Sequence, residues 1–235
     1  SFELLGQLGT DIVHVPVSNH TQFGNDQGMI RWLRQADGSY EYDFSTFDRY
    51  MKLVRKHLIS PDFVVVHVWH AAGWKHRGAK QKNEVTVVDA ETGKAEAMQV
   101  PEFGTDQSKA FWKPVLLAIK KRLDNMGYGE KMALGALSDS TAPVEVFEMF
   151  NEILPDTKWG RFCHVTTRAE GPTLIRGGGK IVLQEFVYVP GLPDPAKPRP
   201  PIWTLLKRPG AAFMRKEFDH SASLLSYRTL PDRAL

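Results

Sequence analysis

Short apolar runs alternate with longer stretches of helical spacing along most of this 235-residue chain. Such runs predict β-strands, and we place them at residues 11–17, 62–70, 131–139, 161–165 and 180–189. The second run is nearly continuous in valine, which is typical of a strand buried on both faces of a sheet. The alternation predicts βαβ units and a parallel sheet.

Three amphipathic helices are predicted between these strands, at residues 45–58, 108–123 and 143–154. In the first, Ser45 is a candidate cap and the apolar positions form one stripe. Pro114 would kink the second helix or delay its start. The third has Thr141 as a candidate cap, a proline in its first turn and Pro155 after its end.

Two β-hairpins are predicted as insertions, at residues 30–44 and 84–100. Asp37-Gly38 and Thr92-Gly93 supply their turns. Each hairpin lies between a strand and the following helix, and in parallel α/β folds these connections form the face that carries binding sites. The hairpins are therefore either walls of a substrate site or plain elaborations of surface loops.

The chain is expected to form one domain over residues 1–235, because 42% hydrophobic residues at this length can bury a single sizeable core. The proline-rich stretch after residue 190 is read as an extended connection, since apolar residues resume at Ile202. A complete (β/α) barrel typically needs about 250 residues. We therefore expect an α/β fold of the TIM-barrel type that is incomplete and lacks its first strand and its C-terminal end.

Charge and composition limit the classes of partner that the chain is expected to bind. Thirty Lys and Arg against 27 Asp and Glu give a net charge of +3 without a basic tract, which argues against nucleic acid. The apolar runs are too short for membrane insertion, and the first residues carry no signal-peptide pattern. Cys163 is the single cysteine, so the chain can hold no internal disulfide or thiolate cluster.

Asp139 is the first candidate for chemistry. Strand alternation places it on one face with Ala133, Gly135 and Leu137, and this small-residue face would look into the barrel. A carboxylate at the carboxyl end of a barrel strand can orient a substrate or stabilise a cationic transition state. The alternative is a cap of the next helix. We favour the catalytic interpretation.

His67 and Trp69 are expected to share the inward face of the second strand, with His70 on the opposite face. An imidazole beside an indole suits a sugar ring, and Trp74 in the following loop would extend this subsite. The alternative, a core histidine beside a packing tryptophan, is equally supported.

Further polar residues lie at or near the ends of the first and fourth strands, where they could bind sugar hydroxyls: His14, Asn19, His20 and His164. Eight histidines raise the question of a metal. A spacing of three on a strand would place His67 and His70 on opposite faces, and no HExxH pattern occurs. We predict no metal and no cofactor.

Two glutamates are candidate proton donors. Glu185 shares a strand face with apolar neighbours, and Glu102 follows the second hairpin in a loop that could overhang a site. Either could act as an acid if its surroundings raised its pKa. The alternative for both is an ordinary surface glutamate.

Several segments together resemble the catalytic domain of glycoside hydrolase family 123. They are GSYEYDFSTFDRYMKLVRKH, VPEFGTDQSKAFWKPVLLAIKKRL, the strand that ends at Asp139, LPDTKWGRFCH and SLLSYRTLPDRAL. The resemblance implies a TIM-type barrel, a carbohydrate substrate, hydrolysis of β-linked N-acetylgalactosaminides, and a secreted or periplasmic location. It also implies a substrate-assisted mechanism with an adjacent Asp-Glu pair.

Asp139 matches the Asp of that pair, which steers the 2-acetamido group, but Ser140 stands in place of the acidic Glu. A serine hydroxyl cannot serve as the general acid near neutral pH. Either Glu102 or Glu185 has taken over this role, or the chain binds glycans without cleaving them efficiently.

Overall fold

The structure is a computed structural model that describes residues 2–7, 12–21, 24–58, 60–70, 83–137, 142–155 and 157–163, together with four short strands after them. In chain order, the elements are α1 (Phe2–Gln7), β1 (Ile12–Pro16), β2 (Arg31–Arg34), β3 (Tyr40–Asp43), α2 (Ser45–His57), β4 (Phe63–His70), β5 (Glu84–Asp89), β6 (Ala95–Gln99), α3 (Asp106–Asn125), the 3₁₀ turn η1 (Gly129–Lys131), β7 (Met132–Leu137), α4 (Val144–Ile153), β8 (Lys158–Cys163), β9 (Thr173–Leu174), β10 (Lys180–Ile181), β11 (Leu183–Val187) and β12 (Trp203–Thr204).

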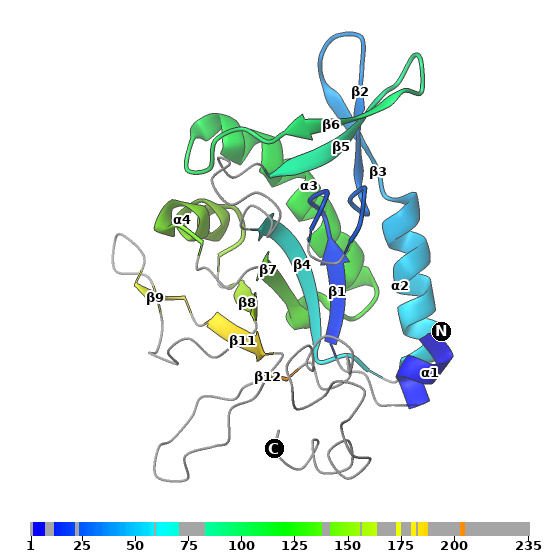
Figure 1. The fold of residues 1–235 in the computed structure, drawn as a ribbon, viewed down its shortest axis with the longest axis vertical. Coiled ribbons are helices and arrows are strands. Elements are labelled where there is room, and N and C mark those ends of the chain that lie inside the picture. The colour runs from blue at the N-terminus through cyan, green and yellow to red at the C-terminus, as the bar shows by residue number, and fades with distance from the viewer. Residues whose placement is uncertain are drawn as a thin grey trace, which may run out of the picture.

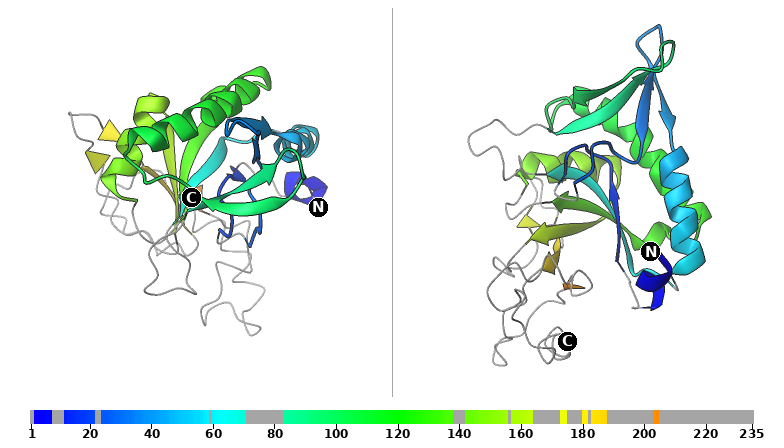
Figure 2. Two further views of the ribbon diagram at one scale, coloured as in Figure 1. Left: turned by 90° about the horizontal axis from the view of Figure 1, so that it is seen from above. Right: turned by 45° about the vertical axis from the view of Figure 1, so that its right-hand side comes forward.

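The main sheet has the order β1-β4-β7-β8-β11-β12, and all neighbouring strands in it are parallel. Helices α2, α3 and α4 lie on the connections from β1 to β4, from β4 to β7 and from β7 to β8. Such crossovers are right-handed, so steps in one direction place their helices on one side of the sheet. Figure 2 shows the three helices together on that side. The predicted α/β fold with a parallel sheet is confirmed, whereas a closed barrel is not seen in the described part of the chain.

The strands depart from the predicted bounds in the second half of the chain. β8 starts three residues before the predicted position 161, and the predicted strand 180–189 is divided. Its first two residues, β10, pair with β9 in a separate antiparallel ribbon, while β11 joins the main sheet. The pair Trp203–Thr204 adds a short strand where an extended connection was expected to end.

All three helix starts differ from the sequence prediction. Helix α4 begins at Val144, with Pro143 at its N-cap rather than in its first turn. Phe44, rather than Ser45, occupies the N-cap of α2, because the Asp43 carboxylate accepts the Ser45 amide at 2.8 Å and turns the chain one residue earlier. Helix α3 begins at Asp106, where the Thr105 hydroxyl accepts the Ser108 amide at 3.1 Å. Pro114 therefore lies inside α3, on its exposed side.

The hydrophobic core lies between the main sheet and its three helices. Alternate residues of β1, β4 and β7 face these helices, and the amphipathic stripes of α2, α3 and α4 cover them. An aromatic group continues this core towards the hairpins, with Trp112 of α3 in contact with Trp32 of β2 and Phe150 of α4. Each of these three rings is fully buried.

The two predicted hairpins are confirmed, and they form one four-stranded sheet because β2 and β5 pair in parallel. Gly38 and Gly93 hold positive φ angles of 82° and 70° at the turns. We call this second sheet the hairpin sheet. It lies beyond the carboxyl ends of β1 and β4 (Figure 1).

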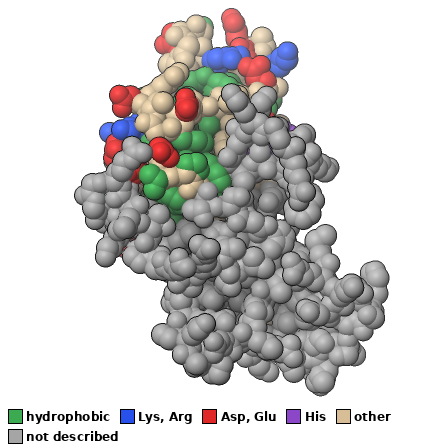
Figure 3. All heavy atoms as spheres, turned by 60° about the vertical axis from the view of Figure 1, so that its left-hand side comes forward, with side chains coloured by type: hydrophobic (Ala, Val, Ile, Leu, Met, Phe, Trp, Pro, Cys, Tyr) green, Lys and Arg blue, Asp and Glu red, His purple; other side chains and the backbone are tan. Residues whose placement is uncertain are grey.

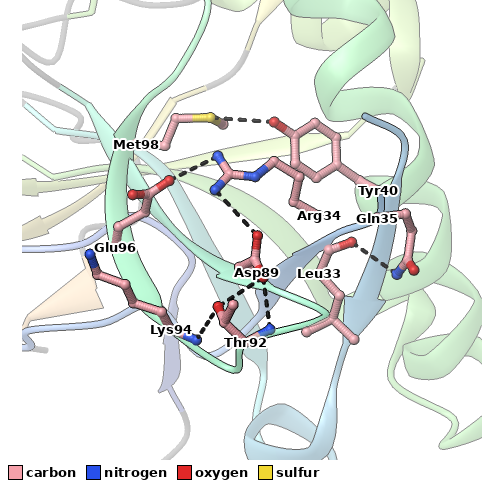
Figure 4. Close-up of polar contacts among 9 residues, drawn as sticks. All are labelled: Leu33, Arg34, Gln35, Tyr40, Asp89, Thr92, Lys94, Glu96 and Met98. Carbon is pink, nitrogen blue, oxygen red and sulfur yellow. Dashed lines mark hydrogen bonds and ion pairs between the residues drawn. The ribbon is translucent and has the colours of Figure 1, made fainter. Parts of the chain in front are cut away.

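Ion pairs join the outer part of the hairpin sheet. Arg34 of β2 contacts Glu96 of β6 at 2.8 Å and Asp89 of β5 at 3.9 Å (Figure 4). Acidic and basic side chains gather at this end of the molecule (Figure 3). All three residues are partly exposed, so these pairs contribute little to stability.

Buried asparagines fix the hairpin sheet to the main sheet. The Asn83 side chain accepts the His70 amide at 2.9 Å and donates to the His70 carbonyl at 3.2 Å. Asn19 accepts the Gly28 amide at 2.8 Å and the Thr86 hydroxyl at 2.9 Å. We call these two residues the asparagine clamps, since they join the ends of β4 and β1 to the hairpins.

Replacement of Asn83 by alanine should lower the free energy of unfolding by about 2 kcal/mol, because it leaves the buried amide and carbonyl of His70 without this partner. Urea unfolding followed by circular dichroism measures the change. Asn125→Ala, at the exposed end of α3, is the matched control and should lie within about 0.5 kcal/mol of the unmodified chain. An equal midpoint for both variants would show that Asn83 is not a structural clamp.

Candidate functional site

The face of the main sheet that points away from the helices carries the candidate site. In β4, Val64, Val66 and Val68 belong to the core on the helix side, so Val65 and His67 point the other way. We call this the inner face. On β7 it holds Ala133 and Gly135, in the arrangement that strand alternation predicts.

His14 of β1 and His67 of β4 contact each other on the inner face. Their Nδ1 and Nε2 atoms are 2.9 Å apart, and the rings stack with centroids 5.2 Å apart at 28°. A hydrogen bond at this distance needs one nitrogen to donate and the other to accept. The two nitrogens therefore share one proton. A second proton on this contact would place two N–H groups face to face.

His67 is held in its neutral form. It is 1% exposed, and this burial lowers the pKa of its imidazole well below the ordinary value. His14 on β1 and His70 on β4 lower the same pKa further, while Gly135 on the β7 side brings no charge. A neutral imidazole acts through hydrogen bonding and shape rather than charge.

Gly135 makes room for the His67 ring. A β-carbon at this position would lie 2.9 Å from Cγ and 2.8 Å from Cε1 of His67, with Nδ1 closer still. These separations are below normal van der Waals contact, so the imidazole can lie against β7 only because residue 135 lacks a side chain. Strand alternation predicts the correct face for Gly135 but not this close contact, whose sequence signal is a glycine in the middle of a strand.

An irregularity in β4 corrects the predicted directions of Trp69 and His70. The register shifts between His67 and Trp69, so Trp69 pairs with Ala136 and His70 pairs with Leu137 of β7. Trp69 consequently belongs to the helix-side core, whereas His70 lies on the side of His67 and influences its pKa. The expected indole beside His67 on the inner face is thus wrong.

The other candidates near the end of β1 divide into one buried and one exposed residue. Asn19 is 2% exposed, and its side-chain oxygen is engaged as an asparagine clamp. His20 is exposed and has a positive φ angle of 52°. The substrate-binding roles assigned to both from the sequence stay predictions.

Of the two candidate acids, Glu102 is exposed in the loop from β6 to α3, where its carbonyl accepts the Thr105 hydroxyl at 2.7 Å. Glu185 lies in the middle of β11, in register with Arg161 of β8. Asp139, Ser140, Trp74 and His164 lie outside the described residues. The catalytic roles of these carboxylates therefore remain predictions as well.

Within the described ranges, no three His, Cys, Asp or Glu side chains are grouped in a way that could hold a metal ion. Over the same ranges, no helix has the length and apolar character needed to cross a membrane.

Comparison with protein families gives a match to the model described as "Glycoside hydrolase 123, catalytic domain" over residues 2–163. This span contains the first four strands of the main sheet, the hairpin sheet and all three crossover helices. No curated protein matches the chain.

Eight chains of solved structures match. One of them is reported as "The details of glycolipid glycan hydrolysis by the structural analysis of a family 123 glycoside hydrolase from Clostridium perfringens". The TM-score is 0.53 at 17% sequence identity, and the alignment covers 69% of this chain. The similarity shows a shared fold, and this chain spans 29% of that structure's length.

The contact between Gly135 and His67 can be tested by a double-mutant cycle. Gly135→Ala should lower the free energy of unfolding by about 1–3 kcal/mol, because the new methyl group overpacks against the ring. In a His67→Ala background the same change should be nearly neutral, since the ring is gone. Additive losses in thermal or urea unfolding would show that the two positions do not meet.

The lowered pKa of His67 predicts a pH-dependent stability. Above about pH 6.5 both the folded and unfolded forms hold this imidazole neutral, and its contribution to stability is fully present. As the pH falls below about 6.5, the unfolded chain binds a proton that the folded chain excludes, so stability should decline by up to about 1.4 kcal/mol per unit.

Urea unfolding between pH 5 and 8 measures this slope, and His67→Gln should reduce it. His57→Gln, at the end of α2 and outside the histidine pair, is the matched control and should keep the slope of the unmodified chain. An unchanged slope in His67→Gln would show that another group causes the acid sensitivity.

Proposed function

Because this chain belongs to glycoside hydrolase family 123, we propose that it hydrolyses β-linked glycosides of N-acetylgalactosamine. The observation that carries the proposal is the match to the family's catalytic domain over residues 2–163, which hold four strands of the main sheet and its three helices. The structural similarity to a family 123 enzyme supports the fold on which this chemistry depends. The substrate is accordingly a glycan.

The carboxyl edge of the main sheet is the proposed location of the site. β7 ends at Leu137, two residues before Asp139, and its neighbour β4 ends at His70. In α/β folds of this kind, substrates bind at the carboxyl ends of parallel strands. Asp139 would thus follow the strand that packs against the neutral His67.

We propose a substrate-assisted mechanism. The carbonyl oxygen of the substrate's 2-acetamido group attacks the anomeric carbon as the glycosidic bond breaks, and the leaving oxygen takes a proton from a general acid. Asp139 would orient the acetamido group and stabilise the positive charge that develops on it. Water then opens the cyclic intermediate and restores the acetamido group on the released sugar.

Because Ser140 stands beside Asp139, the general acid of this scheme must be a glutamate elsewhere in the chain. Glu102 is the stronger candidate, because it precedes α3 on the connection that joins the carboxyl end of β4 to β7. Glu185 lies two strands away from β7 in the sheet order, at the middle of its strand. An acid in this role needs a raised pKa, which a bound glycan would favour by excluding water.

A second candidate function is glycan binding without efficient cleavage. Ser140 favours it, because this position lacks the carboxyl group that the family resemblance places beside Asp139. In that case the same edge of the sheet would recognise the sugar, and Asp139 would only accept hydrogen bonds from it.

Hydrolysis can be measured with aryl β-glycosides, including the N-acetylgalactosaminide. We expect turnover by the unmodified chain and a loss of about 10²–10⁴-fold in kcat for Asp139→Asn, which removes the orienting charge. Glu102→Gln and Glu185→Gln identify the acid, because the relevant variant should lose activity on natural glycans and retain more on activated aryl glycosides.

Glu130→Gln is the matched control, since Glu130 is exposed in η1 just before β7, at the opposite edge of the sheet. It should keep full activity. Saturable sugar binding without turnover would support the binding function instead, and the absence of both binding and turnover would rule out both proposals.

A further inference from the structure

His20 lies in the loop between β1 and β2 and is the single non-glycine residue with a positive φ angle in the described part of the chain. Its φ is 52°, and its side chain is exposed. A residue with a β-carbon is strained in this left-handed region, although histidine occurs there more often than most residues. Such strain persists only where the surrounding structure enforces it.

The residues on both sides of His20 are buried and anchored. Asn19 is 2% exposed, and its amide donates to the Glu84 carbonyl of the hairpin sheet at 2.7 Å. Thr21 is 5% exposed, and its hydroxyl donates to the side-chain oxygen of Asn25. These hydrogen bonds hold the backbone on both sides of His20 and so fix the position of its α-carbon.

Asn25 closes the loop around His20. Its backbone carbonyl accepts the His20 amide at 2.8 Å, and its side-chain nitrogen donates to the carbonyls of Ser18 at 2.9 Å and Gln27 at 3.0 Å. These bonds hold the loop in the conformation that keeps the φ angle of His20 positive. The backbone of His20 is therefore held by hydrogen bonds to described residues on both sides of it.

The position of this loop relates it to the proposed site. His20 follows the carboxyl end of β1, at the same edge of the sheet as the end of β7 (Figure 1). β4 separates β1 from β7, so these two ends lie about 10 Å apart at the usual strand spacing. A group there would meet a part of the glycan away from the acetamido group that Asp139 contacts.

We propose that His20 is a substrate-recognition residue at the rim of the site, where its imidazole exchanges hydrogen bonds with a glycan hydroxyl remote from the cleaved bond. The proposal rests on the proposed function and specifies how the same site reads its substrate. An imidazole both donates and accepts hydrogen bonds, as a sugar hydroxyl does. The strained backbone is then explained by ligand binding, since strain of this kind concentrates at ligand-binding positions.

The test replaces His20 by glycine, which removes the imidazole and also relieves the backbone strain. The probe is a thio-linked N-acetylgalactosaminyl-galactose disaccharide, whose sulfur bridge resists hydrolysis, and calorimetry measures its Kd on the full chain. We expect Kd to rise about tenfold, the equivalent of one hydrogen bond. The melting temperature should stay the same or rise, because glycine adopts positive φ angles without strain.

Two further variants separate recognition from loop structure. His20→Asn keeps a donor and an acceptor on a residue that tolerates a positive φ angle, so it should bind more tightly than His20→Gly. His57→Gly, at the end of α2, is the matched control and should leave Kd unchanged.

A lower melting temperature in His20→Gly would show that the side chain serves the fold, and an unchanged Kd would show that it does not touch the glycan. Absence of binding to the unmodified chain would also overturn the inference. Weakened binding in His20→Gly without turnover by the unmodified chain would uphold the inference while rejecting hydrolysis as the function.

Discussion

The direction of the crossovers is the constraint on which the rest of this structure depends. Three successive connections step the same way across the sheet, from β1 to β4, β7 and β8, and each carries one helix. Right-handed crossovers then place all three helices on one face. The valines of the strands pack there against the apolar stripes of α2, α3 and α4. The inner face is therefore available for polar residues such as His14 and His67.

The hairpin sheet depends on this arrangement because it grows from the same edge. Its two hairpins are inserted after β1 and β4, which are neighbours, so β2 and β5 come close enough to pair. Asn83 then bonds the backbone of His70 where β4 ends, and Asn19 accepts the Gly28 amide ahead of β2 and the Thr86 hydroxyl of β5. The hairpin sheet therefore lies next to the carboxyl edge, and the loop that contains His20 is attached to it through Asn19.

The sequence predicted those features that repeat along the chain and missed those set by single irregularities. Valine-rich strands, amphipathic helices and the two turn glycines at 38 and 93 have strong local patterns, and the structure confirms the elements they indicate. The direction of Trp69 was wrong, because one extra residue in β4 reverses the alternation and no local pattern announces it. The pairing of the two hairpins and the role of Asn83 depend on contacts between segments that are distant in sequence.

The charge of the inner face determines how well a nearby carboxyl group can act as the general acid. A general acid must keep its proton near neutral pH, and a neighbouring cation would lower its pKa and remove that proton. His67 is kept uncharged by burial, and Val65, Ala133 and Gly135 on the same face cannot carry charge, whereas the neighbouring His14 and His70 can. Loss of water would raise the pKa of a carboxyl group that approaches His67, and protonation of His14 or His70 would lower it. An acid supplied from a loop, as proposed for Glu102, would therefore keep its proton while the bound glycan excludes water and His14 and His70 stay neutral.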